Sequence, residues 1–179
     1  WEGIDWKNDV PPNELLRVRL DPNQGKLVSQ HSLTEECATV EFPVVNPKKL
    51  SRPYTYVYCA TSASANEMSP LQGLAKFNVE TGQLLEKWLP EPDQYITEVA
   101  FCPKANSDKE DDGYLMTYIL DPKKRLNELL VFDAANPGKG PISRAPLQGW
   151  SVNHSLHGVF VPGFAPGFSD QVKASFEQK

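Results

Sequence analysis

Residues 74–89 have the sequence LAKFNVETGQLLEKWL, which predicts a β-hairpin. An alternating apolar strand runs into a turn of Asn, Glu, Thr and Gly, and a second apolar strand leaves it. The same order recurs in LRVRLDPNQGKLVSQHSL, residues 16–33, and in LVFDAANPGKGPISRAPL, residues 130–147. The three hairpins begin 58 and 56 residues apart. This spacing predicts one repeating unit along most of the chain.

A second repeat lies between the hairpins. The segments Glu98-Val-Ala-Phe-Cys-Pro103 and His157-Gly-Val-Phe-Val-Pro162 share a polar residue, a Phe and a Pro at equal spacing, and Glu41-Phe-Pro-Val-Val-Asn-Pro47 fits loosely. The leading polar residues are 57 and 59 residues apart. Long apolar strands follow the Glu41 and Glu98 segments, at 54–60 and 114–120. Four strands in roughly 57 residues are typical of a β-propeller blade.

Three polar residues stand where each blade would begin its innermost strand: Glu41, Glu98 and His157. Packing alone does not explain them, because burying an unpaired carboxylate costs several kcal/mol. Carboxylates and imidazoles that converge on one axis are typical of metal ligands and of the groups that orient them. A plain structural role stays open for each: a hydrogen-bonded core histidine, or a strand-end carboxylate paired with Lys or Arg.

Composition excludes several classes of protein. The chain has 179 residues, of which 40% are hydrophobic and 23% charged, which predicts an ordered globular domain. The net charge of −5 and the lack of a basic patch argue against nucleic-acid binding. No apolar run is long enough to span a bilayer. Cys37, Cys59 and Cys102 have neither zinc-site nor redox-motif spacing, and their odd number favours a reducing compartment.

Two further motifs are better explained by structure than by chemistry. The stretch from Glu110 to Gly113 lacks the alternating oxygen spacing of a calcium loop, so we expect a solvated turn. One predicted strand carries a tyrosine at every second position, at Tyr54, Tyr56 and Tyr58. We expect them to pack on one face of a sheet rather than to form a platform for a ligand.

Several motifs, taken together and in order, resemble the carotenoid cleavage oxygenases, which include apocarotenoid and stilbene oxygenases and the retinoid isomerohydrolase. They are VEFPVVNP with PYTYVY, KFNVETG, TEVAFCPK with EDDGYL, LLVFDA and LHGVFVP, and the similarity runs over residues 13–162. The resemblance implies the C-terminal portion of a member: an all-β fold with about three blades of a seven-bladed propeller. We assign residues 1–162 to this partial propeller and residues 163–179 to an irregular tail.

The resemblance also implies a metal site. Family members hold Fe(II) on the propeller axis with four histidines, glutamates hydrogen-bond the ligand imidazoles, and the iron activates O2 to cleave a polyene double bond. His157 matches the last iron ligand, and Glu41 matches a supporting glutamate. Glu98 stands at a further supporting position, although a valine replaces the proline that usually follows it. His31 and His154 match no ligand motif, and no other residue is assigned a catalytic role.

We therefore expect the C-terminal portion of an Fe(II)-dependent carotenoid or apocarotenoid oxygenase, iron-free and inactive as this chain alone. The alternative is a non-catalytic, shortened module of the same fold, serving as a structural or carotenoid-associated subunit of a larger complex. Three blades cannot close a ring, so both need a protein partner or a preceding segment to cover the open sheet edges. The expected location is the plastid, with the cytoplasm as the alternative.

Overall fold

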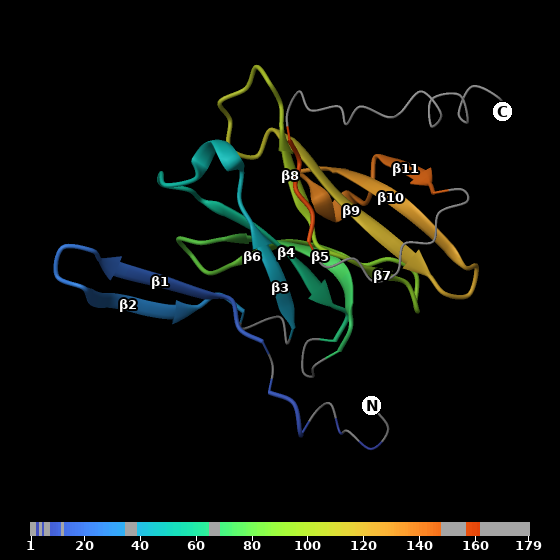
Figure 1. The fold of residues 1–179 in the computed structure, drawn as a ribbon, viewed down its shortest axis with the longest axis horizontal. Coiled ribbons are helices and arrows are strands. Elements are labelled where there is room, and N and C mark those ends of the chain that lie inside the picture. Colours follow the sequence, from blue (N-terminus) through green and yellow to red (C-terminus); the bar gives the residue numbers. More distant parts are fainter. Residues whose placement is uncertain are drawn as a thin grey trace.

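The computed structural model describes residues 3, 5, 8–11, 13–34, 39–64, 69–147 and 157–161. Within these ranges the chain is nearly all β, with eleven strands and two short 3-10 helices. The strands form three antiparallel sheets that follow one another along the chain (Figure 1). In this part of the chain, no helix combines the length and the apolarity needed to cross a membrane.

The three sheets are built from consecutive stretches of the chain. The first sheet is a hairpin of β1 (Leu16–Asp21) and β2 (Lys26–Ser32). The second has the order β3 (Val40–Val44), β4 (Tyr56–Ser62), β5 (Leu71–Asn78) and β6 (Leu84–Trp88). The third contains β7 (Tyr95–Ile96), β8 (Ala100–Pro103), β9 (Gly113–Asp121), β10 (Leu126–Asp133) and β11 (Ser143–Pro146), with β7 and β8 both paired to β9. The helix η1 (Pro47–Lys49) follows β3, and η2 (Pro137–Lys139) follows β10.

The three hairpins lie where the sequence repeat predicts them. The β1–β2 and β5–β6 turns each place a glycine at positive φ, Gly25 at 61° and Gly82 at 73°. A side chain is strained in this left-handed conformation, which explains why both turns use glycine. The β10–β11 connection is longer, because η2 lies within it.

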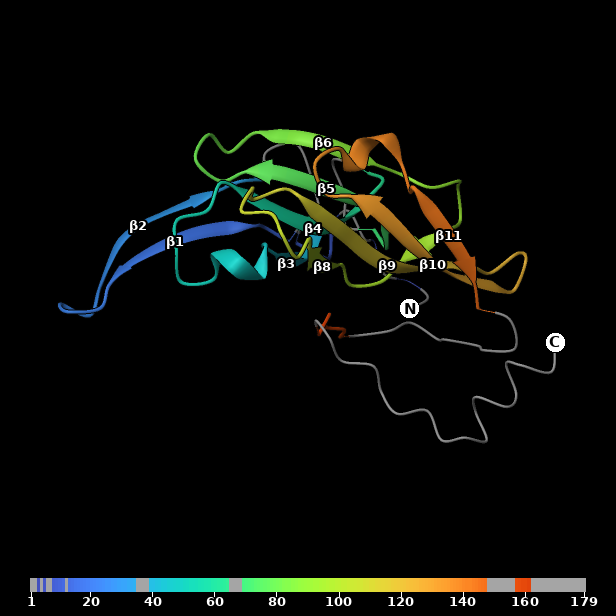
Figure 2. The same ribbon diagram turned by 90° about the horizontal axis from the view of Figure 1, so that it is seen from above.

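The middle sheet is buried on both faces. One face packs against the third sheet, in a cluster that includes Tyr58, Leu74, Phe101 and Phe132. The opposite face belongs to a second cluster with Leu33, which follows β2. Because side chains alternate between the faces of a strand, β4 and β5 bury side chains on both faces of this sheet, whereas the β1–β2 hairpin is largely exposed. The prediction of an all-β partial propeller is confirmed, and Figure 2 shows the three sheets from above. The tail expected at 163–179 lies outside the described residues.

The loop that follows β8 fastens the two larger sheets together. The carboxylate of Glu110 accepts hydrogen bonds from the backbone N–H groups of Thr55 and Tyr56, each at 2.7 Å. The Asn46 amide donates to the Glu110 carbonyl at 2.8 Å, and the Lys48 ammonium donates to three carbonyls of the same loop. The prediction of a solvated turn is therefore wrong for Glu110.

The three tyrosines do not share one face as expected. Tyr56 and Tyr58 pack on the side of the third sheet, where the Tyr58 hydroxyl donates to the carbonyl of Ala134 at 3.0 Å. Burial raises the pKa of Tyr58 far above its usual value. Tyr54 precedes β4 and packs against the cluster on the opposite face. The alternation expected for a strand therefore starts only after Tyr54.

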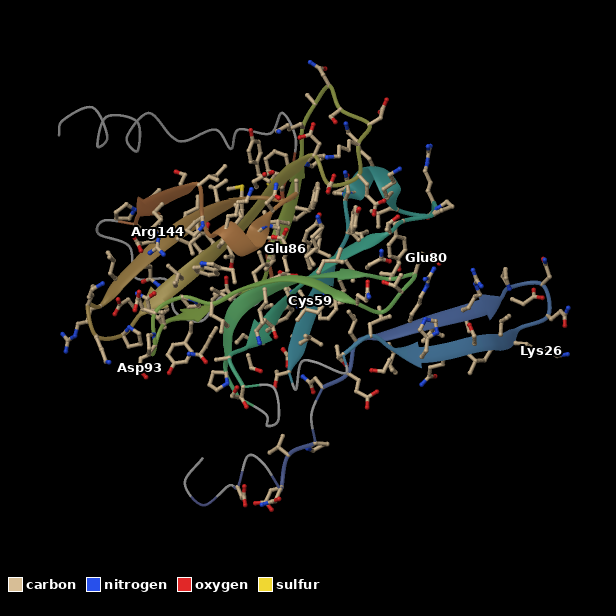
Figure 3. All side chains as sticks on the ribbon, turned by 180° about the vertical axis from the view of Figure 1, so that it is seen from behind. Lys26, Cys59, Glu80, Glu86, Asp93 and Arg144 are labelled. Carbon is tan, nitrogen blue, oxygen red and sulfur yellow. The ribbon has the colours of Figure 1, made fainter. Side chains whose placement is uncertain are left out.

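The described ranges contain two cysteines, Cys59 and Cys102, and both are buried. Cys59 lies at the centre of the molecule, on β4 (Figure 3). Burial raises the pKa of the Cys102 thiol to about 11. Because the thiolate is the reactive form of cysteine, Cys102 is a packing residue rather than a nucleophile.

Candidate metal centre

The innermost strand of the second sheet carries a β-bulge at the first predicted glutamate. Glu41 pairs with Ala60, whereas Val44 pairs with Tyr58, so residues 42–43 together oppose a single residue of β4. A bulge turns side chains away from their regular direction and is common beside functional sites. The Glu41 carboxylate accepts a hydrogen bond from the Asn13 amide at 2.6 Å, which ties the segment before β1 to β3.

A second bulge splits the innermost strand of the third sheet into β7 and β8. Ile96 pairs with Ile119 and Ala100 pairs with Met116, so three residues oppose two. Glu98 is the middle residue of the three. The second predicted glutamate thus stands at the same kind of irregularity as the first, one repeat further along the chain.

The Glu98 carboxylate lies against His157. Its Oε2 accepts the backbone N–H of Gly158 at 2.5 Å and lies 3.5 Å from Nδ1 of His157. The Glu98 side chain is 23% exposed and that of His157 is 73% exposed. Because Nδ1 is turned toward a carboxylate, Nε2 is the nitrogen left free to bind a metal. A ligating imidazole commonly has a carboxylate on its other nitrogen.

Phe42 contacts the same imidazole from the second sheet. The centroids of the Phe42 and His157 rings are 6.0 Å apart, and the ring planes meet at 88°. This is the edge-on geometry that aromatic pairs favour. The two bulges therefore aim one side chain each at His157. Nothing in the sequence pattern singled out Phe42, because the bulge depends on pairing with β4.

The predicted site residues are brought together only in part. Glu98 and His157 are in contact, whereas Glu41 is next to Phe42 in the chain and is bonded to Asn13. Residues 157–161 contain no strand, although an innermost strand was expected to begin at His157. His31 lies exposed on β2, and His154 falls outside the described residues.

The described residues offer too few donors for a complete metal site. The part of the chain that the structure describes holds no cluster of three or more His, Cys, Asp or Glu side chains able to bind one. A metal bound through Nε2 of His157 would therefore take its other ligands from elsewhere. The described residues can thus supply one metal ligand, His157, and one group that supports it, Glu98.

A small cavity opens beside Glu98. Its volume is about 140 Å³, and its lining includes Met116, Tyr118, Leu129 and Phe160. Pockets that enclose a drug-sized ligand are larger, roughly 300–1,000 Å³. The cavity is therefore too small to hold a polyene.

Comparison with known proteins assigns the chain to a family. The family described as retinal pigment epithelial membrane protein (RPE65) matches residues 3–162. Apocarotenoid-15,15'-oxygenase of Synechocystis is 30% identical over 152 residues, which cover 84% of this chain and 30% of that protein. The probable carotenoid cleavage dioxygenase 4, chloroplastic, of Arabidopsis thaliana is 29% identical, over 81% of this chain and 24% of that protein.

A solved structure agrees with these relatives. Cobalt-substituted Synechocystis apocarotenoid oxygenase superposes with a TM-score of 0.71 and 28% identity, over 82% of this chain and 29% of that one. This chain thus spans between 24% and 30% of the length of these relatives. Because the family match covers well over half of its residues, the chain belongs to the RPE65 and carotenoid cleavage oxygenase family.

Proposed function

We propose that this chain is the C-terminal portion of a non-haem Fe(II)-dependent carotenoid or apocarotenoid oxygenase. In this proposal residues 1–162 are propeller and residues 163–179 are a tail. His157 supplies one iron ligand through Nε2, and Glu98 and Glu41 support it. The bound iron would supply O2 activation for cleavage of a polyene double bond. The family membership supports the reaction class, because the named relatives are carotenoid and apocarotenoid oxygenases.

One observation carries the assignment of His157. Oε2 of Glu98 accepts the Gly158 N–H and faces Nδ1 of His157, so one carboxylate anchors both the backbone and the ring of this segment. The imidazole is thereby oriented with Nε2 outward. A carboxylate in this position also fixes which nitrogen of a ligating imidazole carries its proton.

The β1–β2 hairpin supports a further part of the proposal, that a sheet outside this chain completes the propeller. On one face of β1, Leu16, Val18 and Leu20 are exposed, and Leu20 is 65% exposed. The hairpin extends away from the other sheets, with Lys26 near its tip (Figure 3). Apolar side chains that alternate along a strand normally cover a core. We expect the preceding blade of the complete protein, or a partner protein, to pack on this face.

The substrate class and the location are part of the same proposal. A carotenoid or apocarotenoid is the expected substrate, since that is what the named relatives act on. A chloroplast location is supported by the name of the Arabidopsis relative, and the cytoplasm is the alternative. Imaging of the complete protein as a fluorescent fusion distinguishes the two compartments.

The decisive experiment replaces His157 in the complete protein. We expect His157→Ala to abolish both iron retention, measured by mass spectrometry of the metal after desalting, and turnover of a carotenoid. His31→Ala is the matched control, because His31 is exposed on β2 and should keep both. If His157→Ala retains iron, the ligand assignment fails, and the alternative of a non-catalytic structural or carotenoid-associated module takes its place.

A further inference from the structure

Phe42 has an unusual backbone conformation. Its φ is 55°, in the left-handed region that side chains other than those of Gly, Asn and Asp rarely occupy. Pro43 follows directly and narrows the accessible conformations of Phe42 further. A strained residue of this kind persists only where its surroundings hold it, and such residues cluster at functional sites.

The strained backbone sends the Phe42 ring to the site rather than to solvent. Phe42 lies in the β3 bulge, its ring is partly buried against the main core, and it meets the His157 ring edge-on. Glu98 approaches the same imidazole from the other bulge. His157 is thus contacted from two sheets, by a carboxylate at Nδ1 and by an aromatic ring at right angles to its plane.

We propose that Phe42 is a positioning residue for His157, and this proposal rests on the proposed function of His157 as a metal ligand. The carboxylate of Glu98 fixes which nitrogen faces outward, but it leaves the imidazole free to tilt about that contact. The perpendicular Phe42 ring restricts the tilt and so holds the direction of Nε2. An aliphatic side chain fills space without defining the plane of a neighbouring ring, which accounts for an aromatic residue at a strained position.

The test uses the complete protein loaded with Co(II), whose visible absorption bands report ligand geometry. Phe42→Asn tolerates the left-handed φ and removes the ring, Phe42→Leu removes the ring with less change in apolar volume, and Phe42→Tyr keeps the ring. Arg125→Asn is the matched control, since Arg125 has a φ of 51° and lies in the β9–β10 turn. The readouts are the cobalt spectrum, the metal dissociation constant and the melting temperature of the metal-free protein.

We expect Phe42→Asn and Phe42→Leu to shift the cobalt bands and to weaken metal binding about three- to tenfold, less than loss of a hydrogen-bonded supporting group causes. The wild-type cobalt spectrum and metal affinity should be kept by Phe42→Tyr and by Arg125→Asn. Phe42→Asn should change the melting temperature of the metal-free protein only slightly, because relief of the left-handed strain offsets the lost packing of a partly buried ring. A purely structural role would lower the melting temperature and leave the cobalt spectrum unaltered.

Two results separate failure of this inference from failure of the proposed function. If His157→Ala loses the metal but Phe42→Asn has a wild-type spectrum and affinity, the positioning role is wrong and the ligand assignment stands. If His157→Ala keeps the metal, the ligand assignment itself is wrong, and the positioning role falls with it.

Discussion

The ammonium of Lys76 lies 3.2 Å from the carboxylate of Asp111, and the pair joins the two larger sheets. The side chains are only 4% and 11% exposed. Lys76 also donates to the carbonyl of Ala135 at 3.0 Å and lies 4.3 Å from the centre of the Tyr56 ring, a cation–π contact. Burial opposes the charge on Asp111, but hydrogen bonds from Lys76 and Lys109 hold its pKa below the ordinary value.

Breaking this pair should destabilise the protein. Lys76→Met leaves the Asp111 carboxylate in the interface, so we expect the free energy of unfolding to fall by about 3 kcal/mol, the lower end for a broken buried pair. The loss is moderated because Lys109 remains 3.3 Å from Asp111. The exposed pair of Lys123 and Asp93 is the control, and Lys123→Met should cost less than about 1 kcal/mol. Urea denaturation of the complete protein at pH 7 measures both, and equal losses would contradict the prediction.

The difference in stability between wild type and Lys76→Met should depend on pH. A carboxyl group whose pKa is lowered on folding stabilises the folded state above its unfolded pKa, and this contribution is lost as the pH falls through the folded value. For Asp111 the ordinary value is 3.8. The difference should therefore be constant between pH 7 and pH 5 and shrink below about pH 4. A difference that instead shrinks above pH 5 would show that another group carries it.

Glu110 should matter for stability through its two backbone contacts. Glu110→Ala leaves the N–H groups of Thr55 and Tyr56 without their acceptor, at a cost of about 1–3 kcal/mol. Glu110→Gln should recover part of this loss, because its amide oxygen can still accept. Glu91→Ala, at an exposed position, is the control. A Glu110→Ala variant as stable as the Glu91→Ala control in thermal unfolding would refute the role.

The two glutamates should differ in their effect on metal binding. We expect Glu98→Gln to weaken iron retention in the complete protein by roughly 10- to 100-fold, because it removes the carboxylate that orients His157. Glu41→Gln should weaken it less, since the Glu41 carboxylate hydrogen-bonds Asn13 rather than His157. Chelator competition measures the two dissociation constants. The reverse order would show that Glu41 is the main support of the site.

The 179-residue chain by itself should not retain iron. One imidazole cannot supply the multiple ligands that hold Fe(II), since affinity comes from several donors acting together. We expect no stoichiometric iron after reconstitution and desalting, and no cleavage of a carotenoid. The complete protein, treated identically, is the positive control. Stoichiometric iron in the isolated chain would mean that residues outside the described ranges complete a site.

The exposed face of the hairpin should be covered in the complete protein. Leu20→Asp and Val18→Asp should each lower its free energy of unfolding by more than about 2 kcal/mol, because they would bury a carboxylate against another sheet. If the face were open to water, such surface changes would stay within about 0.5 kcal/mol. Gln24→Asp, in the turn of the same hairpin, is the control. If all three variants are equally stable, this face of the hairpin is not covered in the complete protein.

The sequence by itself was enough to predict the hairpins, the repeat and the candidate site residues. Hairpins depend on alternation and turn residues that are local in the chain, so the turns at Gly25 and Gly82 could be placed in advance. Glu41, Glu98 and His157 stood out because polar residues recurred at the period of the repeat. The family resemblance then supplied a chemistry for them.

Only the tertiary structure decided what those residues touch. A bulge depends on the register between two paired strands, so the direction of the Phe42 and Glu98 side chains had no signal in the sequence. The partnership of Lys76 with Asp111 depends on how one sheet stacks on the next. For the same reason Glu110 was mistaken for part of a solvated turn: its partners, Thr55 and Tyr56, are distant in sequence, and only the packing of the sheets brings them to its carboxylate.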